Sequence, residues 1–391
     1  ALNIQRKFIF LMEQKQDHLA KKEGMKMKMQ MHARDKSKLA ARSSHKFEPL
    51  EALDLGKIKN FDDLARGMSK TAFGGRSVGE AVDVMHDMVT DPDCFVVGTF
   101  SGAMTVAKMG LIICDMIDNG MLDLVVTTGA LMTHGFVESV GMRHLKYDFK
   151  TPDIDLYFEG YDRVFDTLEV EKNLDDVSEI VDAILDKSDP DEVLCSHKIT
   201  RLLGEYLHKN VKGRGILKSA YEKNVPVFIP AFTDSELGLD LALYNRQRAI
   251  NGKKPLNFNP FLDLEHYTEI VQKQKKLGIF TIGGGVPRNW AQQVGPYLDL
   301  IRWRILEKGK KESYFAKEGD PYFKRFNYAV RICPEPIYWG GLSGCSYSEG
   351  VSWGKFVPEN EGGRFAEVLS DATIAWPLIL KAVMERMEKN K

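Results

Sequence analysis

The segment DCFVVGTFSG, residues 93–102, joins a short apolar run to a turn of small residues. The run Phe95–Val97 is typical of a strand, and the glycines and serine after it indicate where the strand ends. Four more such runs follow, separated by stretches with a helical pattern, which indicates βαβ units. We therefore expect an α/β fold with a mainly parallel sheet covered on both faces. The other runs are Leu122–Val126, Val225–Ile229, Gly278–Ile282 and Tyr328–Ile332.

Small and polar residues follow the first four of these runs. Each such turn is also an ordinary way to end a strand, and none fits the GxGxxG pattern. In open α/β sheets ligands bind at the carboxyl ends of the strands, so the turns should converge on one crevice. Small residues let a ligand approach the backbone, and N–H groups at a helix start can hold a phosphate, so together they favour a nucleotide site. The turns are Gly98–Ala103, Thr127–Ala130, Thr233–Ser235 and Gly283–Gly285.

Two acidic residues beside predicted strand ends are candidates for holding ribose hydroxyls. They are Asp234 and Asp371. Asp371 suits a second role equally well, because it directly precedes the helical pattern Ala372–Leu380 and would act there as the N-cap.

Composition favours a small-molecule function. The chain has 391 residues, 43% of them hydrophobic, and its 54 basic and 55 acidic residues nearly cancel, so no overall field attracts nucleic acid or a membrane surface. The five cysteines show no CxxC pair and no zinc spacing, which predicts a reducing, cytoplasmic location and no metal site. The apolar stretches are shorter than the roughly 18 residues of a membrane helix, so we expect none.

We expect the chain to divide into a basic arm and one folded domain. Residues 1–47 are rich in Lys, Arg, Met and Gln, which predicts a helical or disordered arm. A targeting peptide is the alternative, and the acidic residues in this stretch count against it. Residues 48–391 are expected to form the folded domain. The charged stretch Arg302–Lys324 interrupts the strand and helix alternation and is interpreted as a surface insertion.

A single lysine lies in the unusual segment SEGVSWGKF, residues 348–356. Apolar neighbours disfavour the ammonium form and lower a lysine's pKa, which is what an imine-forming amine requires, so Lys355 is a candidate nucleophile. Trp353 offers a face for a cationic amine, and Glu349 could pair with an ammonium or carry a proton. The plainer alternatives are an exposed lysine whose stem packs on the tryptophan, and a tryptophan in the core.

The same segment resembles the deoxyhypusine synthase family. The resemblance rests on the residues from Glu349 to Lys355, and on Ser370-Asp371-Ala372 downstream. It extends in order over residues 60–387 through Val126-Thr127-Thr128, Pro226-Val227-Phe228, Thr233-Asp234, Leu237-Gly238, Gly283–Val286, Tyr328-Ala329-Val330 and Trp376-Pro377-Leu378.

The resemblance implies a Rossmann-like NAD-binding fold and a homotetramer with active sites at subunit interfaces. It implies transfer of the aminobutyl group of spermidine, or of a related polyamine, to an acceptor amine through an imine on Lys355. Glu349 and Trp353 fall on substrate positions. Ten residues fall on cofactor positions: Ser101, Gly102, Thr105, Thr128, Gly129, Ala130, Asp234, Gly284, Asp371 and Ala372.

The departures from the family pattern concentrate on the amine substrate. Asn289 stands where the family has a histidine, and Thr133 and His134 replace an acidic pair. Leu239 replaces an acidic residue, with Asp240 beside it, and Leu342 replaces another. We expect Asn289, Asp240 and His134 to contact the substrate, while the acceptor stays open between a protein lysine and a small diamine. Homospermidine synthases derived from this family use putrescine.

Two other functions are compatible with parts of the sequence. A regulator that has lost catalysis would bind NAD and form no adduct on Lys355. A sirtuin-like deacylase shares a similar nucleotide fold, but the chain lacks zinc cysteines and an evident catalytic histidine segment.

Overall fold

The computed structural model describes residue 37 and residues 47–102, 104–308, 319–341 and 343–389. Most of the predicted basic arm lies outside these residues, as do Leu342 and the middle of the predicted insertion. Residues 50–391 form one compact unit. The predicted boundary at residue 48 stays a prediction.

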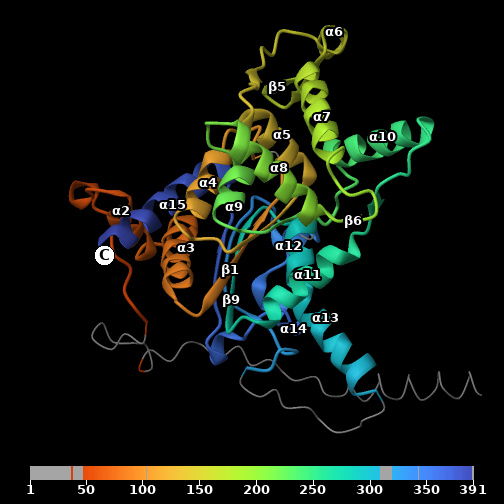
Figure 1. The fold of residues 1–391 in the computed structure, drawn as a ribbon. Coiled ribbons are helices and arrows are strands. Elements are labelled where there is room, and N and C mark those ends of the chain that lie inside the picture. Colours follow the sequence, from red (N-terminus) through yellow and green to blue (C-terminus); the bar gives the residue numbers. More distant parts are fainter. Residues whose placement is uncertain (1–36, 38–46, 103, 309–318, 342, 390–391) are drawn as a thin grey trace, which may run out of the picture. The chain divides into compact units, whose positions relative to one another are not determined.

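A parallel sheet lies at the centre of this unit (Figure 1). In the described residues it has six strands in the order β11-β10-β9-β1-β2-β7, and each neighbouring pair is parallel. Renumbered along the sheet, this is the Rossmann order 3-2-1-4-5-6, whose switch point lies between β1 and β9. The predicted α/β fold is confirmed. The strands are β1 Cys94–Phe100, β2 Leu124–Thr127, β7 Val227–Phe228, β9 Lys276–Ile282, β10 Phe326–Ile332 and β11 Arg364–Val368.

Helices cover both faces of the sheet because successive strand residues point to opposite sides. Val96 and Phe100 of β1 pack in one core with Trp376, whereas Val97 packs in a second core with Tyr267. Helices α3 and α15 line the first face, and α11 to α13 the second (Figure 1). The helices are α2 Phe61–Ser69, α3 Phe73–Thr90, α4 Gly110–Asp118, α5 Gly129–Ser139, α6 Asp153–Glu159, α7 Glu171–Leu185, α8 Ser196–Asn210, α9 Ile216–Glu222, α10 Glu236–Ile250, α11 Phe261–Gln272, α12 Gly285–Gln292, α13 Val294–Ile301, α14 Tyr347–Ser352 and α15 Ala372–Lys389.

Two small sheets were not predicted from the sequence. β3 Leu145–Lys146, β5 Thr167–Val170 and β4 Tyr161–Val164 form an antiparallel sheet between α5 and α7. β6 Val193–Leu194 and β8 Asn257–Phe258 form a parallel pair. These strands are two to four residues long and several face solvent, so they lack the apolar runs that identified the central strands.

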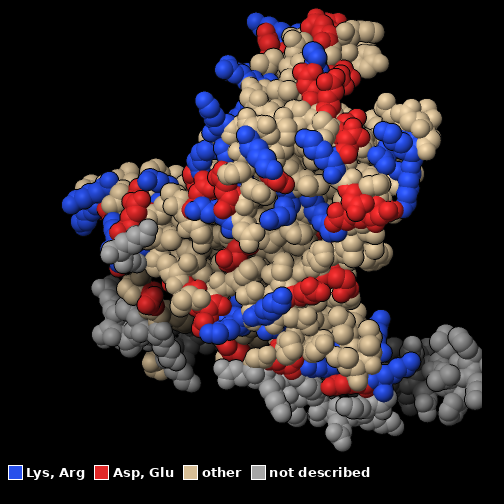
Figure 2. All heavy atoms as spheres, in the orientation of Figure 1, with Lys and Arg blue, Asp and Glu red and all other residues tan. Residues whose placement is uncertain are grey.

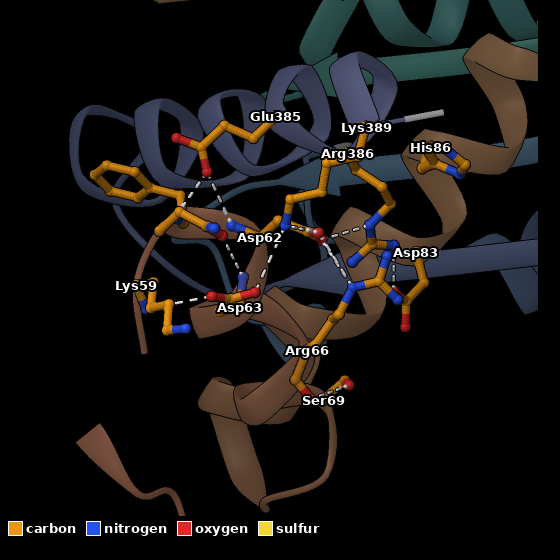
Figure 3. Close-up of polar contacts among 12 residues, drawn as sticks. Lys59, Asp62, Asp63, Arg66, Ser69, Asp83, His86, Glu385, Arg386 and Lys389 are labelled. Atoms are coloured by element: carbon orange, nitrogen blue, oxygen red, sulfur yellow. Dashed lines mark hydrogen bonds and ion pairs between the residues drawn. The ribbon is translucent and has the colours of Figure 1, made fainter. Parts of the chain in front are cut away.

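A buried ion cluster joins the first and last helices of the domain (Figure 3). Asp62 of α2 is 1% exposed, and its carboxylate accepts from Arg386 at 2.7 Å, from Lys389 at 3.0 Å and from Arg66 at 3.2 Å. Arg386 also donates to Asp83 of α3 at 2.6 Å. Burial raises the pKa of Asp62, but the three hydrogen bonds outweigh it and lower the pKa to about 2. We call these residues the Asp62 cluster.

Most described residues of the predicted insertion are exposed, but its first and last residues are anchored in the fold. A π-helical turn, Arg302–Leu306, extends α13, and Arg302 is buried and pairs with Asp320 at 2.7 Å. Lys324 is also buried and donates to the carbonyl of Gln274 at 2.5 Å. These two cations are buried because each has an acceptor within the fold, whereas Arg304 and Lys308 are exposed. Residues 309–318 lie outside the described part.

The surface mixes charges of both signs on the face displayed in Figure 2. Among the residues that the structure describes, no helix combines the length and apolar character required to span a bilayer. All five cysteines have free thiols.

Candidate functional site

The lysine segment is held between a short helix and the start of β10. Ser346 caps α14 by accepting from the N–H of Glu349 at 3.1 Å, and Gly354, with φ +68°, lets the chain turn after the helix. The Lys355 carbonyl then accepts from Phe326 of β10 at 3.0 Å. Phe356 packs in the second core. The backbone of Lys355 is therefore fixed by the core on one side and the helix on the other.

Lys355 is buried and its ammonium meets a neutral partner. The residue is 9% exposed, and its Nζ donates to Oδ1 of Asn289, on α12, at 3.0 Å. Burial lowers the pKa of Lys355; the nearby guanidinium of Arg288 also lowers it, while Cys345 and Glu349 act in the opposite direction. The alternative of an exposed lysine packed on Trp353 is wrong. The net lowering favours the neutral amine that a nucleophile needs.

A pocket of about 330 Å³ opens over this lysine. It brings together four of the predicted catalytic and substrate residues, Lys355, Asn289, Glu349 and Trp353. Trp353 is 65% exposed, so the alternative of ordinary core packing is wrong for it. Glu349 is also exposed, so in this chain it forms a wall of the pocket rather than a buried charge partner. The remaining lining residues are Arg288, Gln292, Gln293, Ile337, Gly340, Gly341 and Cys345.

Arg288 is the residue of this pocket that sequence reasoning missed. It is 2% exposed, its Nη2 donates to the Cys345 carbonyl at 2.6 Å, and its guanidinium lies 5.1 Å from the centre of the Tyr347 ring. Burial is the largest influence on the pKa of Arg288 and lowers it. A charged residue three positions after the glycine turn was the only signal in the sequence. Its charge explains part of the lowered pKa of Lys355.

Two predicted substrate residues do not line this pocket. His134 lies on α5 and contacts Glu169 at 2.9 Å. Asp240 lies on α10, and its pKa is raised to about 6, chiefly by burial. The charges of Asp182 and Glu236 also raise this pKa, whereas a hydrogen bond from Ser178 lowers it. The helices α5 and α10 follow β2 and β7, which are three and four strands from β10. At about 4.8 Å per strand this is roughly 14–19 Å, a separation that sequence order does not reveal.

The turns after β1 and β9 meet at the switch point of the sheet. The hydroxyl of Ser101 donates to the carbonyl of Ile282 at 3.0 Å and accepts from the N–H of Gly284 at 3.0 Å. Gly283 has φ +73°, and a Cβ there would lie 2.3 Å from the Ser101 hydroxyl, so only glycine fits. Gly285 then begins α12. The turn that leads to Asn289 is therefore built directly on the β1 turn.

The turns after β2 and β7 also lie together. Thr128 caps α5 by accepting from the N–H of Leu131, and Ser235 caps α10 by accepting from the N–H of Gly238. A Cβ on Gly129 would lie 2.1 Å from the Ser235 hydroxyl, so the two helix starts are in contact. The turns therefore meet in two pairs, and the single crevice predicted for all four stays a prediction.

The predicted cofactor residues differ in how accessible they are. Gly102 and Asp234 are exposed, and Ala130 is half-buried, at the start of α5. Thr105 is fully buried, and its hydroxyl donates to the Leu131 carbonyl at 2.9 Å, so it serves packing and offers no surface to a ligand. Asp371 is exposed and accepts from the N–H of Thr373 at 2.7 Å, which is the capping role; Ala372 behind it is buried.

A larger cavity of about 450 Å³ lies at the opposite edge of the sheet, where β1, β2 and β7 begin. Its walls include Phe95, Asp123 and Val227, together with His197 and Arg201 of α8. The carboxyl edge is where ligands bind in sheets of this order. It holds the glycine turns, one of which begins α12, the helix of Asn289. We therefore take the smaller pocket around Lys355 as the candidate active site.

Comparisons with known proteins agree with this geometry. A probable deoxyhypusine synthase 2 of Methanosarcina acetivorans is 32% identical over 332 residues, covering 84% of this chain and 88% of that protein. A deoxyhypusine synthase-like protein of Chlorobaculum tepidum is 30% identical over 334 residues, covering 85% and 88%. A solved structure of a candidate deoxyhypusine synthase from Entamoeba histolytica has the same fold, with a TM-score of 0.54 and 16% identity over 86% of this chain and 97% of that one. The family model for deoxyhypusine synthase matches residues 63–383, and the chain belongs to the deoxyhypusine synthase family.

Proposed function

We propose that this protein is an NAD-dependent transferase that moves the aminobutyl group of spermidine, or of a related polyamine, to an acceptor amine through an imine on Lys355. One observation carries the proposal: a buried lysine whose Nζ lies 3.0 Å from the neutral Asn289 side chain, at the wall of an open pocket. Burial without a carboxylate partner lowers the pKa of Lys355 and so favours the neutral amine.

The proposed chemistry uses Lys355 as a temporary carrier. NAD supplies the hydride acceptor at the start and the hydride donor at the end, so the overall transfer is redox-neutral. The neutral Nζ attacks the carbon that has lost hydride, the aminobutyl unit becomes bound as an imine, and 1,3-diaminopropane leaves. The acceptor amine then displaces Lys355 before hydride returns to that carbon. Asn289 orients Nζ through its amide oxygen without adding a charge that would protonate it.

The glycine turns fit a dinucleotide. A Cβ on Gly285, at φ +58°, would meet nothing within 4 Å, and one on Gly102, at φ +75°, would meet only the tip of Met104 at 3.8 Å. Both positions therefore leave open space where a ligand can approach the backbone, next to the starts of α12 and the β1 turn. We propose that these turns hold the phosphates, with Ser101, Gly284, Thr128, Gly129 and Ala130, and that Asp234 and Asp371 with Ala372 hold the riboses.

The amine substrate is proposed to lie between Trp353 and Glu349. The indole offers a face for an ammonium, and the carboxylate offers a counter-charge, but both are exposed in this chain. Tyr338, 85% exposed, and Trp339, 68% exposed, extend this aromatic surface beside the pocket. A second copy of the chain that covers it would bury the substrate, which supports the proposal of a homotetramer with active sites at subunit interfaces. Neither His134 nor Asp240 lines this chain's pocket, so any substrate contact of theirs would have to be made in a neighbouring copy's site.

A small diamine such as putrescine is a second candidate acceptor. Its support is Asn289, which stands where the family resemblance puts a histidine and which here already uses its amide oxygen to hold Lys355. An amide cannot take a proton from the incoming amine as an imidazole can. An acceptor that arrives already deprotonated, or that is relieved of its proton by Glu349, fits this pocket better than one that depends on a histidine.

Mass analysis of products and adducts tests the proposal. The protein is incubated with NAD and either spermidine or putrescine, borohydride is added to trap the imine, and the modified residue is located by peptide mapping. We expect an aminobutyl adduct on Lys355 and release of 1,3-diaminopropane from spermidine. Lys324, also buried but outside the pocket, is an internal control that should stay unmodified. NAD binding with no adduct would instead identify a regulator, and release of nicotinamide would identify a deacylase.

A further inference from the structure

A cluster of two histidines and a glutamate, remote from Lys355, has the form of a metal site. His134 of α5, His144 in the segment before β3 and Glu169 of β5 each place one ligand atom within 4.8 Å of the others. The Nδ1 atom of His134 lies 2.9 Å from Oε2 of Glu169, and Nε2 of His144 lies 2.6 Å from the same oxygen. The two ring nitrogens are 3.3 Å apart. Three ligand atoms of the types preferred by Zn²⁺ therefore face one point.

The cluster is buried far more than a surface group of charges. The side chains of His144 and Glu169 are 0% and 1% exposed, and that of His134 is 12% exposed. A buried carboxylate has to be compensated by a cation, by protons or by hydrogen bonds. The cluster contains two carboxylates, Glu169 and Glu138, and one ammonium, that of Lys108. With neutral imidazoles its net charge is −1, which favours the binding of a cation.

The surroundings orient the three ligands as outer residues do at metal sites. Nδ1 of His144 lies 3.3 Å from Glu138 and 3.1 Å from Lys108, so its ring orientation is fixed from the side away from Glu169. The other oxygen of Glu169 accepts from the N–H of Val170 at 3.1 Å and from Asn173 at 2.9 Å, which aims Oε2 at the histidines. Glu138, His144 and Glu169 thus form a chain of contacts in which the histidine lies between two carboxylates.

We propose that His134, His144 and Glu169 bind one divalent transition-metal ion, with Zn²⁺ as the ion to test. Zn–N and Zn–O bonds of about 2.0–2.1 Å put the ligand atoms of a tetrahedral site roughly 3.3 Å apart, so the trio has to open by less than about 1 Å. Three ligands leave one position for water, on the His134 side, which is the more exposed. The ion would tie the β3–β5 sheet to α5, the helix that begins at the Thr128 turn.

This inference is independent of the proposed transfer reaction and runs against the absence of a metal site expected from the sequence. That expectation considered cysteine spacing, whereas these ligands lie 10 and 25 residues apart and meet only through the fold of residues 134–169. The same geometry suits a hydrogen-bonded cluster in which a histidine is protonated. Metal content, rather than activity, distinguishes the two.

The test uses the full chain, stripped with a chelator and then titrated with Zn²⁺ or Co²⁺. We expect one tightly bound ion per chain, a Co²⁺ visible spectrum typical of tetrahedral N and O ligands, and a Zn²⁺-dependent rise in Tm. His134→Gln and Glu169→Gln should lose the tight ion and the rise in Tm. His208→Gln is the matched control, because His208 pairs with Glu222 at 2.9 Å on the surface, and it should keep both.

Several outcomes would overturn the proposal. A bound-ion content well below one per chain, or a Co²⁺ spectrum of hexa-aquo type, would leave a hydrogen-bonded cluster only. Equal metal content in His134→Gln, Glu169→Gln and the unchanged protein would place the ion elsewhere. If a variant does not fold, the Co²⁺ spectrum of the unchanged protein still decides, since it requires no substitution.

Discussion

The Asp62 cluster and the Lys355 pocket each bury an ionisable side chain, but the two regions give it opposite kinds of partner. Asp62 is 1% exposed and receives three cationic donors (Figure 3), whereas Lys355 is 9% exposed and bonds a neutral amide. Among the described residues no carboxylate forms an ion pair with Lys355. The three cationic donors therefore lower the pKa of Asp62 and keep its carboxylate ionised. Burial without a paired carboxylate lowers the pKa of Lys355 and favours its neutral amine.

This difference separates a structural site from a chemical one. A paired buried charge is costly to break and does not readily change its protonation state, so it suits the joint between α2, α3 and α15. An unmatched buried base changes its protonation state easily and faces an open pocket, so it suits reaction. Both regions contain charged residues in an apolar setting, and only the identity of the partner tells them apart.

The largest expected effect is on the chemistry of Lys355. Lys355→Arg keeps the positive charge, cannot form the imine and stays protonated, so aminobutyl transfer should fall by about a thousandfold or more. Folding and NAD binding should be unchanged, as measured by circular dichroism and calorimetric titration. Lys324→Arg, at a buried lysine outside the pocket, is the matched control and should retain activity. Normal turnover by Lys355→Arg would mean that the covalent route is wrong.

The Asp62 cluster should show the reverse pattern, a loss of stability without a loss of chemistry. Asp62→Asn leaves Arg386 buried without its main counter-charge, which should cost about 3–5 kcal/mol of unfolding free energy. Denaturant unfolding measures this cost. The folded fraction should keep its transfer rate and its NAD affinity. Asp63→Asn, at the neighbouring and more exposed aspartate, should cost less than about 1 kcal/mol.

The same cluster predicts how stability depends on pH. The pKa of Asp62 is about 2 in the folded protein and 3.8 when free, so the folded state binds the proton less well. Its contribution is complete above about pH 4 and disappears as the pH falls from about 4 to 2. Asp62→Asn should flatten the acid limb of unfolding in that window. An unchanged limb would show that Asp62 does not carry this pH dependence.

Glu349 tests whether the pocket in a single chain is complete. Glu349→Gln should raise the KM for the polyamine by about fivefold, because an exposed carboxylate contributes only about 1 kcal/mol to an ion pair. NAD affinity should not change. Glu361→Gln removes an exposed glutamate outside the pocket and is the control. A loss of more than about a hundredfold would indicate a desolvated site, closed by a second subunit. An equal loss of polyamine and NAD affinity would contradict the assignment.

The sequence was sufficient for five of the six strands of the central sheet in the described residues and for the residues around Lys355. The run Phe95–Val97 lies within β1 because buried strands require continuous apolar residues. The family resemblance assigned Lys355 and Asn289 to one site, and both line the same pocket, but their hydrogen bond was not predicted. β11 escaped notice because Arg364 and Glu367 interrupt its apolar pattern. Each of them pairs with a residue distant in sequence, Arg364 with Asp87 and Glu367 with Arg331.

One physical cause explains why His134, expected at the substrate, lies outside this chain's pocket and why Arg288, which lines it, was missed. A site depends on which strands are neighbours, and the place of a residue along the chain does not reveal this. His134 follows β2 and turns towards Glu169, 35 residues later, whereas Arg288 follows β9, which lies beside β10 and the lysine segment. Strand order is set by packing over the whole sheet, and no local pattern contains it.

The most specific test changes the partner of Lys355 rather than the lysine itself. Asn289→Asp puts a carboxylate about 3.0 Å from Nζ and makes the pocket resemble the Asp62 cluster. An opposite charge at this distance should raise the pKa of Lys355 by about 1–3 units, so the neutral fraction at pH 7 falls about tenfold per unit. The acid limb of the kcat profile should move to higher pH by the same amount, with the high-pH rate largely kept. Gln293→Glu, on the same pocket wall one helical turn away, adds equal charge farther from Nζ and should move the limb less. If both variants shift the limb equally, the general field of the pocket rather than the Asn289 contact sets the reactivity of Lys355.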